Sequence, residues 1–275
     1  MSATMIQSKL TMTDAVSYNK YSMVQKRDNK RCLNENINRM TWRGGDRVLD
    51  IGCGDGSFTA TELRRFLPDD VSELVGCDRS REMVDFANKH FGAAGINFRL
   101  LEIGPQLPTE FVGTFDHVFA FFSLNWITDQ RLAFSQVYDI LTKGGDCLML
   151  IVGRGPAIYD VYKVFARSPK WCRWVKMLDK VLPPYHDCDD PEEKIRRIAE
   201  EVGFKHIYVQ CNQSSYKFDC VEDFKGFIIA INPFKIPEEH CDEYLEEFVR
   251  VAMEQRYITD DLTMTYTTYT FFGRK

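Results

Sequence analysis

The sequence predicts an α/β fold in which a mostly parallel sheet is doubly wound. A short apolar, β-rich run at residues 47–51 leads into a loop with glycine at every second position and then into the start of a helix. A second run of this kind spans residues 73–78. Strand-like and helix-like segments alternate as far as residue 152, which is typical of parallel strands joined by right-handed crossovers.

Apolar periodicity predicts the elements of this first part. A helix is predicted over residues 18–40, because Leu33, Ile37 and Met40 recur at helical spacing. Further strands are predicted at 96–103, at 115–126 with its carboxyl-end loop, and at 146–152, and helices at 83–91 and 129–141. Gly144 and Gly145 are expected to end the last of these helices.

The alternation breaks after residue 154. Residues 158–165 and 171–181 carry large apolar side chains at helical spacing, and a helix is predicted from Asp190-Pro191 to Val202, with Gly203 at its end. Two β-rich runs, 206–211 and 265–272, are expected to pair antiparallel, with two helices between residues 221 and 256.

These elements predict the domain organisation. Residues 1–17 are expected to be a disordered tail, 18–153 a cofactor-binding core with an N-terminal lid helix, 154–202 an inserted helical cap, and 203–275 the rest of the sheet with a second insertion at about 221–258. The insertions are rich in aromatic side chains. These either simply bury against one another or also form a deep apolar pocket over the carboxyl edge of the sheet.

Composition disfavours several classes of protein. The chain of 275 residues has a net charge of −5 and scattered basic residues, which disfavours a nucleic-acid partner. No apolar run approaches the ~20 residues of a membrane span, and the first residues lack the apolar centre of a signal peptide, so a cytoplasmic location is expected. The nine cysteines are odd in number and lack a C-x-x-C pair, so reduced thiols are expected, buried in apolar runs at Cys77, Cys147 and Cys211.

No metal is expected in the protein. The metal-like cluster from His186 to Asp190 lies in a polar turn and lacks a second group of ligands at zinc spacing. No Ser/His/Asp or Cys/His arrangement stands out, and the histidines are interpreted as structural.

The glycine loop gives the strongest functional signal. Gly52, Gly54 and Gly56 follow Asp50, and glycine lets a ligand approach the backbone closely. A dinucleotide site would have its third glycine one residue later, and the carboxylate of Asp50 would repel phosphate but suits an ammonium group. The spacing resembles motif I of the class I S-adenosylmethionine (SAM)-dependent methyltransferases, and a structural tight turn is the alternative.

A second carboxylate supports this interpretation. Asp78 ends the strand after that loop, where an acid can accept hydrogen bonds from ribose hydroxyls. Capping of the next helix is the alternative, but Ser80 is available for that role. Past the third strand, Glu102 and Ile103 would lie beside an adenine, and an ordinary loop acid is the alternative for Glu102.

The end of the fourth strand is expected to face the reacting group. Ligands bind open α/β sheets beyond the carboxyl ends of the strands, where the strand order reverses, and strands one and four should flank that point. The residues placed there are Phe121, Phe122, Ser123, Asn125 and Trp126. Position alone leaves open whether Trp126 is a pocket wall or part of the core.

The first helix carries a face that mixes aromatic and polar groups. Gln25 shares this face with Tyr18, Tyr21 and Ser22. Spacing alone favours an exposed amide for Gln25, because a charge run follows it.

Several longer segments are similar to the insect juvenile hormone acid O-methyltransferases. They are Tyr18-x-Lys20-x-Ser22-x-x-Gln25-Lys-Arg-Asp28, Asp50-x-Gly-Cys-Gly-Asp-Gly56, Val75-Gly-Cys-Asp78, Met83-Val84, Phe115-Asp-His-Val118, Trp126-Ile127-x-Asp129-Gln130 and Ala230-Ile-Asn-Pro-Phe-x-Ile-Pro237. The resemblance covers nearly the whole chain after the tail. It implies a Rossmann-like seven-stranded sheet with an inserted helical and aromatic cap, and methyl transfer from SAM to the carboxylate of farnesoic acid or juvenile hormone acid.

The resemblance also implies roles for single residues. Asp50, Gly52 and Gly54 would hold the amino acid part of SAM, and Asp78 its ribose. Gln25 and Trp126 would donate hydrogen bonds to the acceptor carboxylate. Further candidates for cofactor binding are Arg79, Met83, Glu102, Ile103 and Phe119, and for acceptor binding Tyr18, Tyr21, Phe122, Ser123, Asn125, Tyr159, Tyr162 and Trp174.

This chemistry fits the absence of an obvious general base. A carboxylate is already ionised at neutral pH, so the enzyme needs only to exclude water and align the reactants. The expected partner is a small apolar carboxylic acid, and a homodimer is left open. Two alternatives also stay open: methylation of another small acid, such as a fatty acid or aconitate, and a silent paralogue that binds SAM or a terpenoid acid without transfer.

Overall fold

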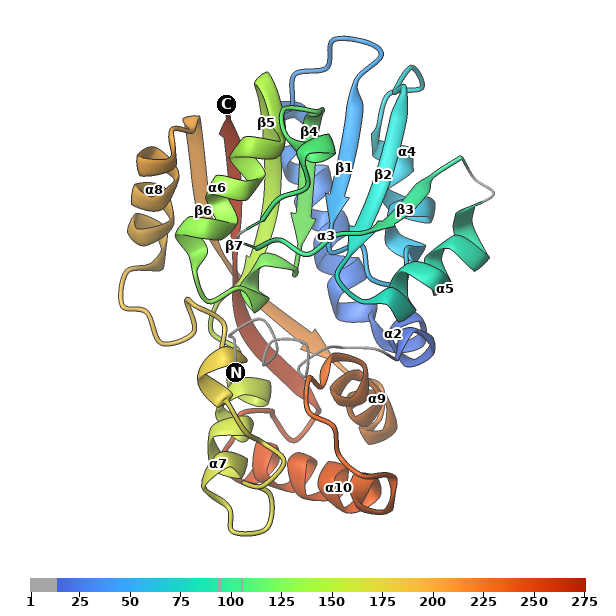
Figure 1. Ribbon diagram of the computed structural model, residues 1–275. Helices are drawn as coiled ribbons and strands as arrows, with labels where there is room; N and C mark the ends of the chain where they lie inside the picture. The colour runs from blue at the N-terminus through green and yellow to red at the C-terminus, as the bar shows by residue number, and fades with distance from the viewer. Residues whose placement is uncertain (1–13, 93–94, 105) are drawn as a thin grey trace.

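One seven-stranded sheet forms the centre of the protein (Figure 1), in a computed structural model that describes residues 14–92, 95–104 and 106–275. The strands are β1 (Arg47–Ile51), β2 (Glu73–Asp78), β3 (Asn97–Leu100), β4 (Phe115–Phe121), β5 (Leu141–Val152), β6 (Lys205–Lys217) and β7 (Thr263–Arg274). Their order is β3-β2-β1-β4-β5-β7-β6, and β7 runs antiparallel to β5 and β6. The predicted mostly parallel sheet is confirmed, with β1 beside β4 at the reversal of strand order.

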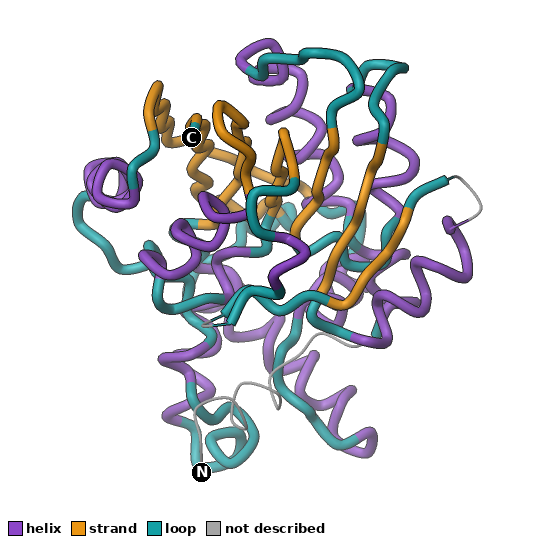
Figure 2. Tube along the Cα trace, turned by 45° about the horizontal axis from the view of Figure 1, so that its top comes forward, coloured by secondary structure: helices purple, strands orange, loops and turns teal. Residues whose placement is uncertain are grey.

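Helices cover both faces of the sheet, as Figure 2 shows. Those on one face are α3 (Met23–Asn36), α4 (Arg64–Phe66) and α5 (Arg81–Phe91), and those on the other are α6 (Gln130–Ile140) and α8 (Pro191–Val202). Successive side chains of a strand point to opposite faces. Leu148 of β5 therefore packs toward α3, while Cys147 and Met149 pack toward α6.

A helical cap lies beyond the carboxyl ends of β1 and β4 (Figure 1). It contains α7 (Val161–Arg167), α9 (Val221–Ile231) and α10 (Glu238–Glu254), and the extended ends of β6 and β7 join it. Its core is aromatic, with the ring of Phe165 packed against Trp171, Tyr244 and Phe248. Most of the predicted cap aromatics bury against one another in this way.

The predicted helix over residues 18–40 is broken. α2 (Ala15–Tyr21) and α3 meet at Ser22, whose ψ of 28° takes the backbone out of the helix. The predicted disordered tail is wrong for residues 15–17, which begin α2 because Asp14 caps it by accepting a hydrogen bond from the Ser17 amide. Residues 1–13 of that prediction lie outside the described residues.

Two further boundaries differ from the sequence prediction. β5 already begins at Leu141, so Gly144 and Gly145 lie inside the strand, where a side chain at Gly145 would clash with a backbone oxygen of β4. Residues 171–181 form turns with one short 3-10 segment, because Met177 has a left-handed backbone (φ 57°) that interrupts any helix. The prediction for α8 and its end at Gly203 is confirmed.

The cysteines of the described chain are free thiols. Cys77 and Cys147 are buried as predicted, but Cys211 is only half-buried because it lies on the edge strand β6. Within the parts of the chain that the structure describes, no helix combines the length and the apolar character that crossing a membrane requires.

Candidate active site

The glycine loop after β1 approaches two other segments closely. Gly52 and Gly54 have φ of 74° and 57°, which favours glycine at both positions. A Cβ on Gly52 would lie 2.2 Å from the Cβ of Ser123, and one on Gly54 would lie 3.1 Å from the ring of Tyr18. The loop therefore sits between the end of β4 and helix α2.

Asp78 fastens this loop to the start of α5. Its carboxylate accepts hydrogen bonds from the Gly54 amide (3.1 Å) and the Ser80 amide (2.8 Å). The hydroxyl of Ser80 caps α5 by accepting a bond from the Met83 amide, as predicted. Burial raises the pKa of Asp78, and these two amide donors oppose that shift.

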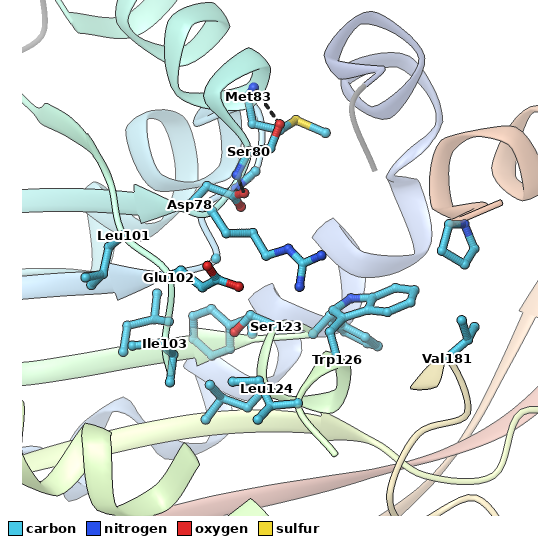
Figure 3. Close-up of a pocket in the computed structure, with 18 of the residues that line it drawn as sticks. Asp78, Ser80, Met83, Leu101, Glu102, Ile103, Ser123, Leu124, Trp126 and Val181 are labelled. Atoms are coloured by element: carbon cyan, nitrogen blue, oxygen red, sulfur yellow. Dashed lines mark hydrogen bonds between the residues drawn. The ribbon is translucent and has the colours of Figure 1, made fainter. Parts of the chain in front are cut away.

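A main cavity of about 280 Å³ opens at the carboxyl ends of the strands (Figure 3). It brings together these predicted site residues: Tyr18, Gly52, Gly54, Asp78, Arg79, Met83, Glu102, Ile103, Phe122, Ser123 and Trp126. The cap closes its far side with Met177, Lys180, Val181 and Pro233. In Figure 3, Trp126 lies between the turn at Asp78 and Val181 of the cap.

An inner cavity of about 20 Å³ lies behind the glycine loop, against α3. Asp50 lines this space rather than the main cavity, and the Thr59 hydroxyl donates to its carboxylate at 2.6 Å. Burial raises the pKa of Asp50 to about 7, although the Thr59 bond opposes the shift. A carboxylate that is costly to ionise is well placed to receive a cation.

Orphaned polar atoms surround the inner cavity. The side-chain oxygens of Ser22, Gln25 and Asn29 are buried there without a hydrogen-bond partner. A buried acceptor with no partner is costly in a folded protein, so these atoms are suited to a ligand that donates hydrogen bonds. The expectation of an exposed Gln25 is wrong, because its side chain is only 8% exposed.

An ion-pair network fixes the direction in which α3 presents these side chains. Asp28, one turn after Gln25, is 1% exposed and accepts a hydrogen bond from the Tyr266 hydroxyl of β7 at 2.5 Å. The Arg27 guanidinium donates to the carboxylate of Asp28 and to Tyr266. These bonds hold α3 against β7.

An apolar cavity of about 60 Å³ lies on the cap side of the site. Its walls are mainly Val24, Val152, Ile158, Tyr159, Phe227, Ile231, Met264 and Tyr266. Gln25 and Asn125 add amide groups, and the Oδ1 atom of Asn125 is buried without a partner. This cavity suits an apolar molecule with one polar end.

Four predicted site residues line none of these three cavities. Phe119 points from β4 into the core beneath α3. Tyr162 is buried between Phe234 and Phe248, and Trp174 packs on Trp171 and His240. Tyr21 fills the space that a side chain at Gly226 of α9 would need. The structure therefore places these four in packing contacts.

The metal-like cluster is occupied by ion pairs. Asp160, His186 and Asp187 come together, but Lys163 bonds to both carboxylates and Arg154 bonds to Asp160. The His186 ring accepts from the Gly155 amide and donates to Asp160. This network braces the turn that leads into α7.

The comparisons with known proteins agree with this geometry. The methyltransferase domain family Methyltransf_25 matches residues 48–145. The chain is 43% identical to the juvenile hormone acid O-methyltransferase of Bombyx mori over 248 residues, which cover 90% of this chain and 88% of that protein. The chain belongs to the juvenile hormone acid O-methyltransferase family. The Drosophila melanogaster enzyme of that name is 31% identical over 249 residues, with 88% and 83% covered.

Membership in the juvenile hormone acid O-methyltransferase family confirms the predicted enzyme class, a SAM-dependent O-methyltransferase. The fold also matches phosphoethanolamine N-methyltransferase 2 of Haemonchus contortus, solved in complex with SAM. The TM-score is 0.53 at 20% identity, with 88% of this chain and 52% of that chain covered. This likeness supports the Rossmann-like fold.

Proposed function

We propose that the protein methylates the carboxylate of a sesquiterpenoid acid, farnesoic acid or juvenile hormone acid, with SAM as the methyl donor. The observation that carries the proposal is the apolar cavity, which shares lining residues with the main cavity and includes the buried amide of Gln25 in its wall. The relatives from Bombyx mori and Drosophila melanogaster are named for juvenile hormone acid. An apolar wall with one polar end suits such an acid.

The residues around the two other cavities fit SAM. Asp50 and the orphaned oxygens of Gln25 and Asn29 would hold its ammonium group in the inner cavity. Gly52 and Gly54 would hold the rest of the amino acid part, and Asp78 the ribose hydroxyls. Glu102, Ile103, Arg79 and Met83 line the same main cavity, where the nucleoside would lie.

SAM would supply the methyl group from its sulfonium, and the protein would hold the acid and SAM in the orientation that the transfer needs. The acid is ionised at neutral pH, so no residue needs to take its proton. Gln25 and Trp126 would donate hydrogen bonds that direct one carboxylate oxygen toward the main cavity. Neutral donors suit this task, because an arginine would stabilise the carboxylate more in the ground state than in the transition state, where its charge is lost.

α2 would serve as the lid over these ligands. Tyr18 lies on the glycine loop and lines all three cavities, while Tyr21 packs on α9 of the cap. We also propose that the enzyme acts in the cytoplasm, which suits free cysteines, and that nucleic acid is not a partner, because its charge is negative.

The affinity for SAM is expected to peak between about pH 7 and pH 8. The pKa of Asp50 is raised to about 7, so below that pH the carboxyl must lose a proton before it can receive the ammonium group. The affinity should then fall about tenfold per pH unit. Above about pH 8 the amino group of the ligand itself loses its charge. Titration calorimetry from about pH 5.5 to about pH 9 measures this profile, since the pKa values of Asp50 and of the ligand amino group both lie in that range.

Thr59→Val provides the matched control for the pH profile. It removes the hydroxyl that lowers the pKa of Asp50, so the acidic limb should move to higher pH while the alkaline limb stays in place. If the acidic limb stays at the same pH in this variant, Asp50 does not bind the ammonium group.

The proposed reaction is tested with labelled SAM and a panel of acids. Farnesoic acid and juvenile hormone acid should give methyl esters, whereas aconitate should give little or none, because its several carboxylates do not suit the apolar cavity. Equal transfer to palmitic acid would widen the proposed substrate class to fatty acids. Transfer to aconitate would shift the function to small polar acids. SAM binding without transfer to any acid would indicate a silent paralogue.

A further inference from the structure

Three aromatic side chains lie at the boundary between the main cavity and the apolar cavity. Tyr18, Phe122 and Trp126 line both spaces. They come from three separate elements: helix α2, the residue after β4, and the short turn Leu124–Trp126. If the cofactor occupies one cavity and the acid the other, the transferred methyl group crosses between these rings.

The backbone at Phe122 is held in an unfavourable conformation. Its φ is 51°, a left-handed value that is rare for a bulky residue and that occurs at functional sites when the surroundings enforce it. Its amide donates to the Leu150 carbonyl at 2.8 Å, and the neighbouring Ser123 packs directly on Gly52. Its ring packs against both the cap core and the sheet core beneath α3. The fold thus fixes this ring at the boundary.

The surroundings of the rings favour a cation. Asp50, Asp55 and Asp78 are all within electrostatic reach of Tyr18, and burial together with these carboxylates raises the pKa of its phenol, so the ring stays neutral. Lys180 and Arg79 line the main cavity only and do not reach the apolar cavity. Faces of neutral aromatic rings attract cations, most strongly where water is excluded.

We propose that Tyr18, Phe122 and Trp126 form an aromatic collar that binds the sulfonium group and thereby distinguishes SAM from its product, S-adenosylhomocysteine. This inference rests on the proposed function. Methyl transfer breaks the sulfur–carbon bond, whose electron pair stays on sulfur, and forms an oxygen–carbon bond with a carboxylate lone pair. The sulfonium becomes a neutral thioether, so the attraction to the collar ends with the reaction. The collar favours release of the product.

Phe122→Leu tests the collar by binding alone. Titration calorimetry should show the affinity for SAM lowered about fivefold, since an aliphatic side chain keeps the packing but loses the attraction to a cation. The affinity for S-adenosylhomocysteine should stay within about twofold, because its sulfur is neutral. Phe122→Tyr keeps an aromatic face and should restore the wild-type ratio of the two affinities.

Phe227→Leu is the matched control, because Phe227 lines the apolar cavity but not the main cavity. It should leave the ratio of the two affinities unchanged. Equal losses for both ligands in Phe122→Leu, or no loss, would overturn the collar while leaving the proposed function intact. If Phe122→Leu does not fold, Tyr18→Leu gives the same comparison. A wild-type protein that binds neither ligand would instead contradict the proposed function.

Discussion

Gln25→Ala and Trp126→Phe should each lower kcat/KM for the sesquiterpenoid acid about 30-fold. Each removes one hydrogen-bond donor from a site that excludes water, and a bond to a charged group there contributes about 2 kcal/mol. Trp126→Phe keeps an aromatic ring, so its effect isolates the indole N–H. Steady-state kinetics with saturating SAM measure both variants.

Gln136→Ala is the matched control for the loss of a buried amide. Gln136 is 7% exposed, and its Oε1 atom also has no partner, but it lies on α6 away from the three cavities. It should keep kcat/KM within about twofold of wild type, because its side chain lines none of the three cavities. Full turnover by both Gln25→Ala and Trp126→Phe would show that neither residue orients the acid.

The sequence predicted the parts of the site that local patterns encode. The loop from Gly52 to Gly56 needs glycine because another segment lies close to each of its three glycines, and that need is visible as alternating glycines. Asp78 was predictable because two parallel strands joined by one crossover end at the same edge of the sheet, so the carboxyl end of β2 lies beside the glycine loop that follows β1. Ser80 followed from helix capping.

The sequence did not predict contacts that depend on which face of a strand or helix points toward the cavities. Phe119 is a predicted cofactor contact, but alternate residues of β4 face opposite layers, and Phe119 points into the core beneath α3. Gln25 looked exposed because its neighbours are charged, whereas the bond from Tyr266 to Asp28 turns that face of α3 inward. Asn29, one turn after Gln25, was missed, although the same helical spacing would have placed it there.

The cap contributed the residues that sequence analysis could not place. Met177, Lys180 and Val181 belong to irregular turns, and Pro233 belongs to the loop between α9 and α10. The helical spacing of residues 171–181 includes Val181, but no pattern marks any of the four as facing the main cavity, because their approach to it depends on how the cap packs on the long strands β6 and β7. Tyr162 is a predicted acceptor contact that lies in the cap core instead, because helical spacing cannot tell a pocket face from a core face.

Asp78→Ala should weaken SAM binding about 100-fold, the largest loss expected for a single cofactor contact. The substitution removes the acceptor for the ribose hydroxyls, at a cost of about 2 kcal/mol or more. It also frees the Gly54 and Ser80 amides, which both donate to this carboxylate, so the glycine loop loses its anchor to α5. Calorimetry with SAM measures the affinity.

Two variants separate these contributions. Asp78→Asn keeps one side-chain oxygen, which can still accept from one of the two amides and, more weakly, from the ribose, so its loss should be intermediate. Asp85→Ala removes an exposed carboxylate from the same helix, α5, and should leave the affinity unchanged. An Asp78→Ala variant with wild-type affinity would refute the ribose contact. An equally large loss in Asp78→Asn would show that a single side-chain oxygen cannot replace the carboxylate, whose two oxygens accept separately from the Gly54 and Ser80 amides.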